Sequence, residues 1–305
     1  MTLSLPWIAG IIIFLLLTPV LAMLLVRRLI PMTEVEEEEI ALDEPSLEFE
    51  SLRDFWESMV PHLTELRDRM MKAGGAVILG TVISSIFVFN KLIYGKSLTD
   101  IVYDQFVPAG VKLLAATVAE AFVNSMHIAL LVGLVFALPV VAYQIFAFFA
   151  PALNPLEKRM VFTSIPFITE LFIAGLVFGW FITVPAAVGF LTTFDSSDRV
   201  QNMPTVTSVV SIVTTLLLWN GAIFELPAII YLLARLGVVT TETLARTRRY
   251  AIAIIVVAAA VITPTGDPYN LALLAVPMYL LYEMGIVLTR FVPKREPKEE
   301  SVGSQ

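Results

Sequence analysis

The chain has 305 residues, 57% of them apolar, and a mean hydropathy of +0.83. Soluble domains usually contain about 45–50% apolar residues, so we expect a membrane protein whose length limits the number of spans. The absence of cysteine excludes disulfides, thiolate metal sites and cysteine nucleophiles. The formal net charge of −7 comes largely from one acidic tract and gives no reason to expect a nucleic acid partner.

Residues 1–30 are predicted to form an extra N-terminal transmembrane helix. Its apolar part, Pro6–Val26, has about 20 residues, enough to cross a hydrocarbon core roughly 30 Å thick. A cleaved signal peptide carries its positive charge before the apolar core, whereas Arg27 and Arg28 follow it here. We therefore expect an uncleaved helix with its N-terminus outside and these arginines in the cytoplasm. A signal peptide is the alternative.

Residues 31–60 are interpreted as an acidic cytoplasmic linker. From Glu34 to Glu50 the chain contains nine acidic residues and no basic residue. Repulsion between like charges disfavours a compact fold, so we expect a solvated tether. The functional alternative is an acidic docking strip for basic cytoplasmic segments.

The segment after Pro61 is predicted to be an amphipathic helix at the cytoplasmic surface, continuing into a span over Ala73–Leu92. Polar and apolar residues each recur at spacings of three and four, as on two faces of a helix. The polar face holds His62, Glu65, Arg69 and Lys72, and the apolar face holds Leu63, Leu66 and Met70. The outside loop that follows, Tyr94–Val123, is too interrupted to span and is expected to form short helices at the outer surface.

Five further spans are predicted. They are Ser125–Phe149, Met160–Val184, Val206–Leu233, Ala251–Ile262 and Leu271–Leu288, the last two short for a bilayer. The tail, residues 293–305, is expected to be disordered and cytoplasmic. In this topology four basic residues, Lys91, Lys96, Lys112 and Arg199, lie outside. The other sixteen of the twenty lie inside, as the positive-inside rule predicts.

Acidic residues inside the predicted spans are candidate functional residues. Glu170, Glu225 and Glu283 each lie in a span, where an acid costs several kcal/mol unless it is neutral, paired or wetted. Together with helix-breaking prolines they would suit a proton-coupled secondary transporter of a small solute, although the halves of the chain show no inverted repeat. We find no protease, hydrolase or nucleotide-binding motif and only two histidines, so we expect neither an enzyme nor a metal or other cofactor.

Several motifs carry a resemblance to one family. The stretch ALPVVAYQIFAFFAPALNPLEKR, Ala137–Arg159, closely resembles the segment that joins the second and third helices of TatC, the multi-spanning subunit of the twin-arginine protein translocase. Similar short motifs follow the family order: HLTELR at the first core helix, EAF in the outer loop, FELP in the fifth span, and TPTGDPYN before the last. Gly266 replaces a proline that is usual in the last of these motifs. The resemblance covers Pro61–Val292.

The resemblance implies an all-α polytopic membrane protein: a six-span TatC-like core, residues 61–292, preceded here by the extra helix. It implies a multi-pass protein of the cytoplasmic membrane, with a cytoplasmic C-terminus, in an oligomer. Its partners would be membrane lipid, twin-arginine signal peptides and TatA- and TatB-like single-span subunits, with export of folded proteins driven by the proton-motive force. The implied signal-peptide site comprises Glu65, Arg67, Pro139, Phe148 and Glu157. The implied intramembrane polar or partner site comprises Glu225, Asp267 and Glu283.

Overall fold

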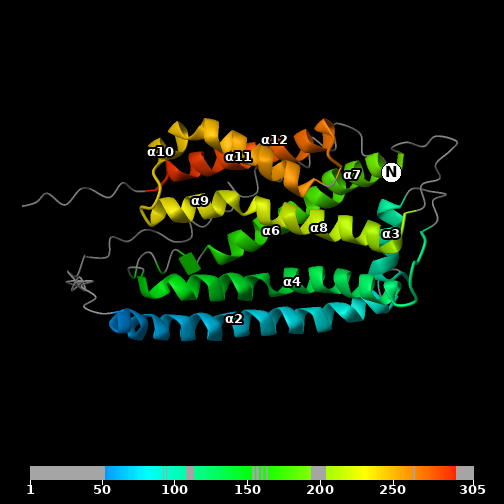
Figure 1. The fold of residues 1–305 in the computed structure, drawn as a ribbon, viewed down its shortest axis with the longest axis horizontal. Coiled ribbons are helices and arrows are strands. Elements are labelled where there is room, and N and C mark those ends of the chain that lie inside the picture. Colours follow the sequence, from blue (N-terminus) through cyan, green and yellow to red (C-terminus); the bar gives the residue numbers. More distant parts are fainter. Residues whose placement is uncertain are drawn as a thin grey trace, which may run out of the picture. The chain divides into compact units, whose positions relative to one another are not determined.

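The computed structural model describes the chain from Leu52 to Val292 (Figure 1). Gaps in the description fall at positions 92, 94, 108–112, 153–154, 156–157, 159–160, 163, 194–203 and 264. The predicted N-terminal helix, the acidic tract, the tail and Glu157 therefore lie outside the described residues. Within those residues the secondary structure is helical apart from two isolated β-bridges, as predicted for an all-α membrane protein.

The chain divides into two compact units, residues 1–222 and 223–305. The first contains α2 (Leu52–Phe89), α3 (Leu98–Phe106), α4 (Glu120–Phe149), the 3₁₀ turn η1 (Ala150–Ala152), α6 (Ile165–Phe178), the π-helix η2 (Gly179–Thr183), α7 (Val184–Thr193) and most of α8 (Val206–Phe224). The second contains α9 (Leu226–Arg235), α10 (Thr241–Arg246), α11 (Arg248–Ile262) and α12 (Pro268–Thr289).

Five helical stretches of the described chain are long and apolar enough to cross a membrane. They are Val60–Phe89, Glu120–Phe149, Ile165–Thr192, Val206–Arg235 and Pro268–Thr289. The predicted fifth core span, α11, has 15 residues and is about 22 Å long, so it is short, as expected. The expectation that the last span is also short is wrong, because α12 has 22 residues, or about 33 Å.

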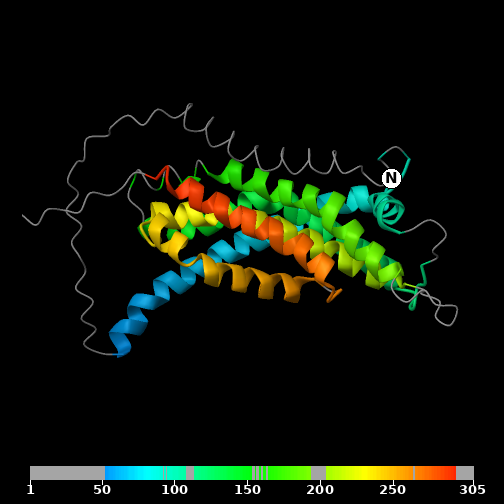
Figure 2. The ribbon, with the colours of Figure 1, turned by 90° about the horizontal axis from the view of Figure 1, so that it is seen from above.

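The predicted surface helix and first core span form one continuous helix, α2, of 38 residues. It begins at Leu52, so the last residues of the predicted linker are helical. Seen from above, the first turns of α2 project away from α4 and α6 (Figure 2). The first turns of α2 therefore extend beyond the packed part of their own unit.

The fourth predicted span, Met160–Val184, is displaced along the chain to Ile165–Thr192. The helix continues past Pro185, which has no N–H to donate to the preceding turn. Directly before it the helix widens into the π-helix, where the Val184 N–H donates to the Gly179 carbonyl. This change of hydrogen-bond register accommodates the proline within the span.

The described part of the outer loop contains one short helix, α3, rather than several. α3 begins with a capping box in which Ser97 and Asp100 each accept a hydrogen bond from the other's main-chain N–H. The segment Leu113–Ala119, expected to be helical, is extended or turning instead, and Leu114 forms a β-bridge with Thr205. Two main-chain hydrogen bonds, from Leu114 to Pro204 and from Val206 to Leu114, satisfy this backbone in place of a helix.

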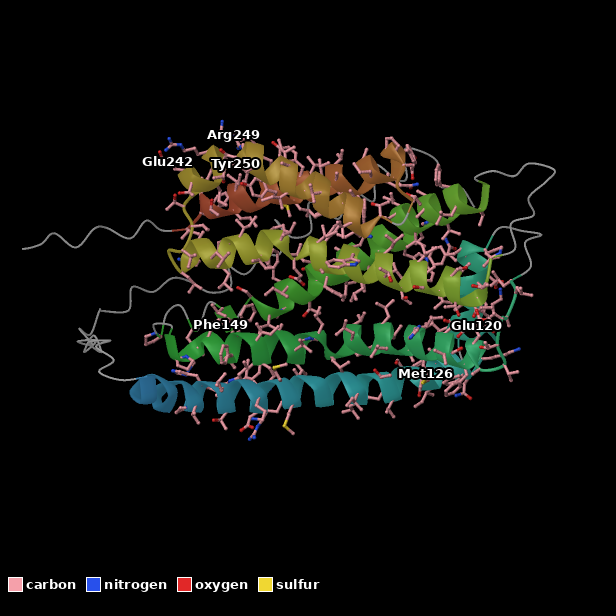
Figure 3. The ribbon with its side chains drawn as sticks, viewed as in Figure 1. Glu120, Met126, Phe149, Glu242, Arg249 and Tyr250 are labelled. Atoms are coloured by element: carbon pink, nitrogen blue, oxygen red, sulfur yellow. The ribbon has the colours of Figure 1, made fainter. Side chains whose placement is uncertain are left out.

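A buried carboxylate anchors this loop to the start of α8. Glu120 is the first residue of α4, and its Oε1 accepts a 2.8 Å hydrogen bond from the Thr207 N–H (Figure 3). Its Oε2 accepts from the N–H groups of Ala116 and Thr117. Asn124, one turn further, donates to the Thr207 hydroxyl at 3.0 Å. Free N–H groups at a helix N-terminus favour an anionic acceptor, which explains a carboxylate here.

Small residues bring α2 and α4 into backbone contact. A Cβ atom added to Gly80 would lie 2.4 Å from the Gly133 carbonyl oxygen, and one added to Gly133 would lie 2.4 Å from the Thr81 nitrogen. The buried Ser84 hydroxyl donates to the Ala129 carbonyl at 2.5 Å in the same seam. Transmembrane helices associate through such close packing and hydrogen bonds, because lipid supplies no hydrophobic driving force between them.

Adding a methyl group to this seam should loosen the first unit. We expect Gly80→Ala to lower the free energy of unfolding by about 1–3 kcal/mol, because the new Cβ would press on backbone rather than on a flexible side chain. The measurement is helical circular dichroism during unfolding in mixed detergent micelles. Gly75→Ala is the matched control in the same helix: nothing lies within 4 Å of its added Cβ, so it should be neutral or stabilising by up to about 1 kcal/mol. Equal effects of the two variants would contradict the close contact.

Candidate functional site

The Glu65 carboxylate on α2 already holds a guanidinium. Its Oε1 accepts hydrogen bonds from Arg69 Nε at 3.0 Å and from Arg69 Nη2 at 2.5 Å. The two residues are one helical turn apart, at the i, i+4 spacing that brings side chains together, and both are partly buried. The geometry therefore displays a carboxylate that binds the forked edge of an arginine side chain.

Arg67 has a different environment. Its guanidinium pairs with the neighbouring Asp68 at 3.2 Å, and both side chains are more than half exposed, so the pair contributes little to stability. The stem of Arg67 borders a shallow apolar depression. Leu63, Leu66, Arg67, Met70 and Met71 line it. Flexible methionine side chains suit a surface that must accept apolar partners of different shape.

Two further predicted residues lie on α4. Pro139 is exposed, and α4 continues through it without a break. Phe148 is partly exposed and packs edge-on against Phe149, with ring centroids 5.2 Å apart. Phe149 is labelled at the end of α4 in Figure 3. Phe148 follows Pro139 by nine positions, which corresponds to about 14 Å along a helix.

Glu65 and Phe148 lie at the same end of the first unit. α2 and α4 run antiparallel, since Phe89 near the end of α2 stacks on Phe122 at the start of α4. The helices meet at Gly80 and Gly133. Glu65 lies fifteen residues before Gly80, and Phe148 lies fifteen residues after Gly133. Both are therefore about 22 Å from the crossing, on the same side of it.

Glu225 lies at a break between two helices. It occupies the turn between α8 and α9 at the N-cap position of α9, followed by Leu226 and the buried Pro227. One carboxylate oxygen, Oε1, is buried and has no hydrogen-bond partner. A buried carboxylate oxygen without a donor is costly, so this position has capacity for one further polar contact.

Glu283 has two partners within the second unit. It accepts a 2.8 Å hydrogen bond from Arg248 Nη2, and another of 2.8 Å from the Tyr279 hydroxyl. The arginine stands at the start of α11 and the acid near the end of α12, so the ion pair joins these helices. This acid in a predicted span is therefore paired, as its environment requires.

Asp267 caps α12. Its Oδ1 accepts from the Asn270 N–H at 2.8 Å and its Oδ2 from the Asn270 side-chain amide at 2.7 Å. Desolvation opposes ionisation, but the two hydrogen bonds from Asn270 outweigh it, and the pKa of Asp267 is lowered to about 2. Glu283 follows Asp267 by sixteen positions, which corresponds to about 24 Å along α12. Asp267 and Glu283 therefore lie near opposite ends of α12 and have different partners.

Comparisons with known proteins agree on one family. Residues 61–277 match the family model TatC, described as Sec-independent protein translocase protein. The chain is 32% identical over 239 residues to a Sec-independent protein translocase protein TatC of Carboxydothermus hydrogenoformans, covering 78% of this chain and 95% of that protein. The TatC protein of Deinococcus radiodurans is 37% identical over 243 residues, covering 78% and 88%.

A solved structure has the same fold. The crystal structure titled Twin Arginine Translocase Receptor- TatC superposes with a TM-score of 0.63 at 32% sequence identity. The superposition covers 76% of this chain and 99% of that chain. The similarity therefore extends over essentially all of that structure.

Substitutions at Asp267 can distinguish the effect of its helix-capping hydrogen bonds from the effect of its negative charge. Asp267→Ala should lower the thermal midpoint by a few degrees, because the first turn of α12 loses its acceptor. Asp267→Asn should retain most of the stability, since asparagine also caps helices well. The Asp267 contribution is complete above about pH 4 and declines as the pH falls toward 2, because folding lowers the pKa from 3.8 to about 2. The thermal midpoints of wild type and Asp267→Asn should therefore approach each other as the pH is lowered from 5 to 2. A difference that stays constant over this range would contradict the lowered pKa of Asp267.

Proposed function

Because this chain belongs to the TatC family, the Sec-independent protein translocase proteins, we propose that it binds twin-arginine signal peptides where α2 begins and α4 ends. As a TatC protein it is the core subunit of the twin-arginine translocase, a multi-pass membrane transport protein and not an enzyme. Family membership also removes the basis for a small-solute transporter.

The observation that carries the proposal is the contact between Glu65 and Arg69. The carboxylate holds a guanidinium through two N–H groups, one from Nε and one from Nη2. An arginine of a signal peptide would take the place of Arg69 at the same oxygen. Lysine offers a compact point charge without the planar fork, so the site favours arginine over lysine.

The second arginine of the peptide requires a second acceptor, and we assign this role to Glu157. It follows Phe148 by nine residues, and Phe148 lies at the level of Glu65 along the two antiparallel helices. Glu65 and Glu157 would then each take one guanidinium. We propose that this end faces the cytoplasm, in the cytoplasmic membrane.

The apolar part of the signal peptide would follow the depression beside Glu65. The stem of Arg67 and the methionines at positions 70 and 71 offer an adaptable apolar surface there. On α4, the exposed Pro139 and the partly exposed Phe148 would offer the peptide further apolar contacts. We therefore propose that Arg67 acts through its stem, since its charge would repel a cationic peptide.

We further propose that Glu225 accepts a hydrogen bond from a TatA- or TatB-like single-span subunit. Its free buried oxygen supports this role. Asp267 and Glu283 are engaged by Asn270, Tyr279 and Arg248, so they would hold α11 and α12 in position around that site. Oligomerisation and use of the proton-motive force belong to the same proposal, while the extra N-terminal helix stays a prediction.

Peptide binding tests the role of Glu65. Glu65→Ala should weaken binding of a fluorescent twin-arginine peptide about tenfold or more, because a charge-assisted hydrogen bond is lost. Glu157→Ala should act similarly, and a twin-lysine peptide should bind weakly to wild type. Fluorescence anisotropy with protein in nanodiscs measures this. Asp68→Asn is the matched control, an exposed acid three residues along the same helix. Unchanged binding by both alanine variants would refute the proposal.

Substitution of Arg69 should change the peptide affinity in the opposite direction to substitution of Glu65. Arg69→Gln frees the carboxylate from its internal partner, so peptide affinity should rise about twofold, the strength of a typical i, i+4 pair. The same anisotropy titration, repeated at several salt concentrations, measures the effect. A loss as large as that of Glu65→Ala would mean instead that the pair acts as one unit in shaping the start of α2.

A further inference from the structure

Five arginines gather at one end of the second unit. They are Arg235 at the end of α9, Arg246 at the end of α10, Arg248 and Arg249 at the start of α11, and Arg290 after α12. Two hydrogen bonds fasten α10 to the last turns of α12: the hydroxyls of Thr241 and Thr289 lie 2.8 Å apart, and Tyr282 donates to the Leu244 carbonyl at 2.8 Å. The cluster thus combines residues from α9, α10, α11 and the end of α12, and these hydrogen bonds hold α10 against α12.

The positive charge of this end is not neutralised by the described part of the chain. Glu283 pairs with Arg248 alone. Glu242 is exposed on α10, and no ion pair joins it to an arginine of the cluster. Within the described residues, no carboxylate lies in ion-pairing distance of Arg235, Arg246, Arg249 or Arg290. The five arginines and the two carboxylates, Glu242 and Glu283, together leave a local net charge of +3.

Arg249 is held at the surface by the ring next to it. Its guanidinium lies 4.7 Å from the centre of the exposed Tyr250 ring and donates to the Tyr250 hydroxyl at 2.9 Å. Figure 3 shows both residues near Glu242, where α10 joins α11. An exposed tyrosine beside an arginine is the combination found at the level of lipid head groups.

The apolar surface of α11 continues from this cluster. α11 contacts α12 and α10, and it exposes large apolar side chains along its length. They are Ile252, Ile254, Val256, Val257 and Val261. The positive end of the α11 dipole also points at the cluster, and the Thr247 hydroxyl donates to earlier carbonyls rather than capping the helix. A cationic head-group region therefore adjoins a surface fit for acyl chains.

We propose that this end binds a phospholipid with a net negative head group, its phosphate between Arg246 and Arg249 and its acyl chains along α11. Zwitterionic lipids carry their own cation and would leave the three charges uncompensated. A soluble acidic segment could neutralise the positive charge, but it would leave the apolar surface of α11 uncovered. The proposal is independent of signal-peptide binding, since none of its residues belongs to that site.

Native mass spectrometry of the full chain, released from detergent with equimolar phosphatidylglycerol and phosphatidylcholine, tests the site. Wild type should retain phosphatidylglycerol in preference. Each arginine near an anionic head group should contribute about fivefold, so Arg249→Gln should lose about fivefold in retention and Arg246→Gln/Arg249→Gln about 25-fold. Lys91→Gln, which removes one exposed cation in the first unit, is the matched control and should retain the lipid. Unfolding midpoints without added lipid should be equal for all variants.

Three outcomes would overturn the proposal. Equal retention of the two lipids by wild type would mean that head-group charge is not recognised. Unchanged preference in the double variant would place the lipid elsewhere. Displacement of phosphatidylglycerol by millimolar inorganic phosphate would mean that the arginines bind a free phosphate and that α11 adds nothing.

Discussion

The contact of Gly80 on α2 with Gly133 on α4 sets the geometry of the first unit. Because neither residue has a side chain, the two backbones touch, and the Ser84 hydroxyl reaches the Ala129 carbonyl across the same seam. Helices in lipid gain little from burying apolar surface against each other, so this contact determines how they pair. This contact also sets the positions of Glu65 and Phe148, because each lies fifteen residues along its helix from the crossing point.

Much of this architecture could be predicted from the sequence. Apolar runs located the membrane helices, and the three- and four-residue spacing after Pro61 correctly indicated a helix that continues into the first core span. Glu65 and Arg69 are four residues apart, a spacing at which oppositely charged side chains of a helix can pair, and they do form an ion pair. Local signals of this kind are strong because a helix brings close residues together without help from the rest of the fold.

Other features depend on contacts that no local pattern records. The pairing of Glu283 with Arg248 spans 35 positions, and the anchoring of Thr207 by Glu120 spans 87. The continuation of the fourth span beyond Val184 depends on a π-helix before Pro185. The non-helical stretch before Glu120 is stabilised by Pro204 and its neighbours from a distant part of the chain. Such residues are found only once tertiary packing is known.

The equal distance of Glu65 and Phe148 from the glycine crossing has a consequence for insertions and deletions. Removing one residue from either helical arm would rotate the side chain at its end by about 100° and move it by about 1.5 Å, so the two would no longer share a level. Removing one residue from each arm would keep them level. Related chains can therefore vary the depth of this half of the protein in the bilayer, provided that both arms change length together.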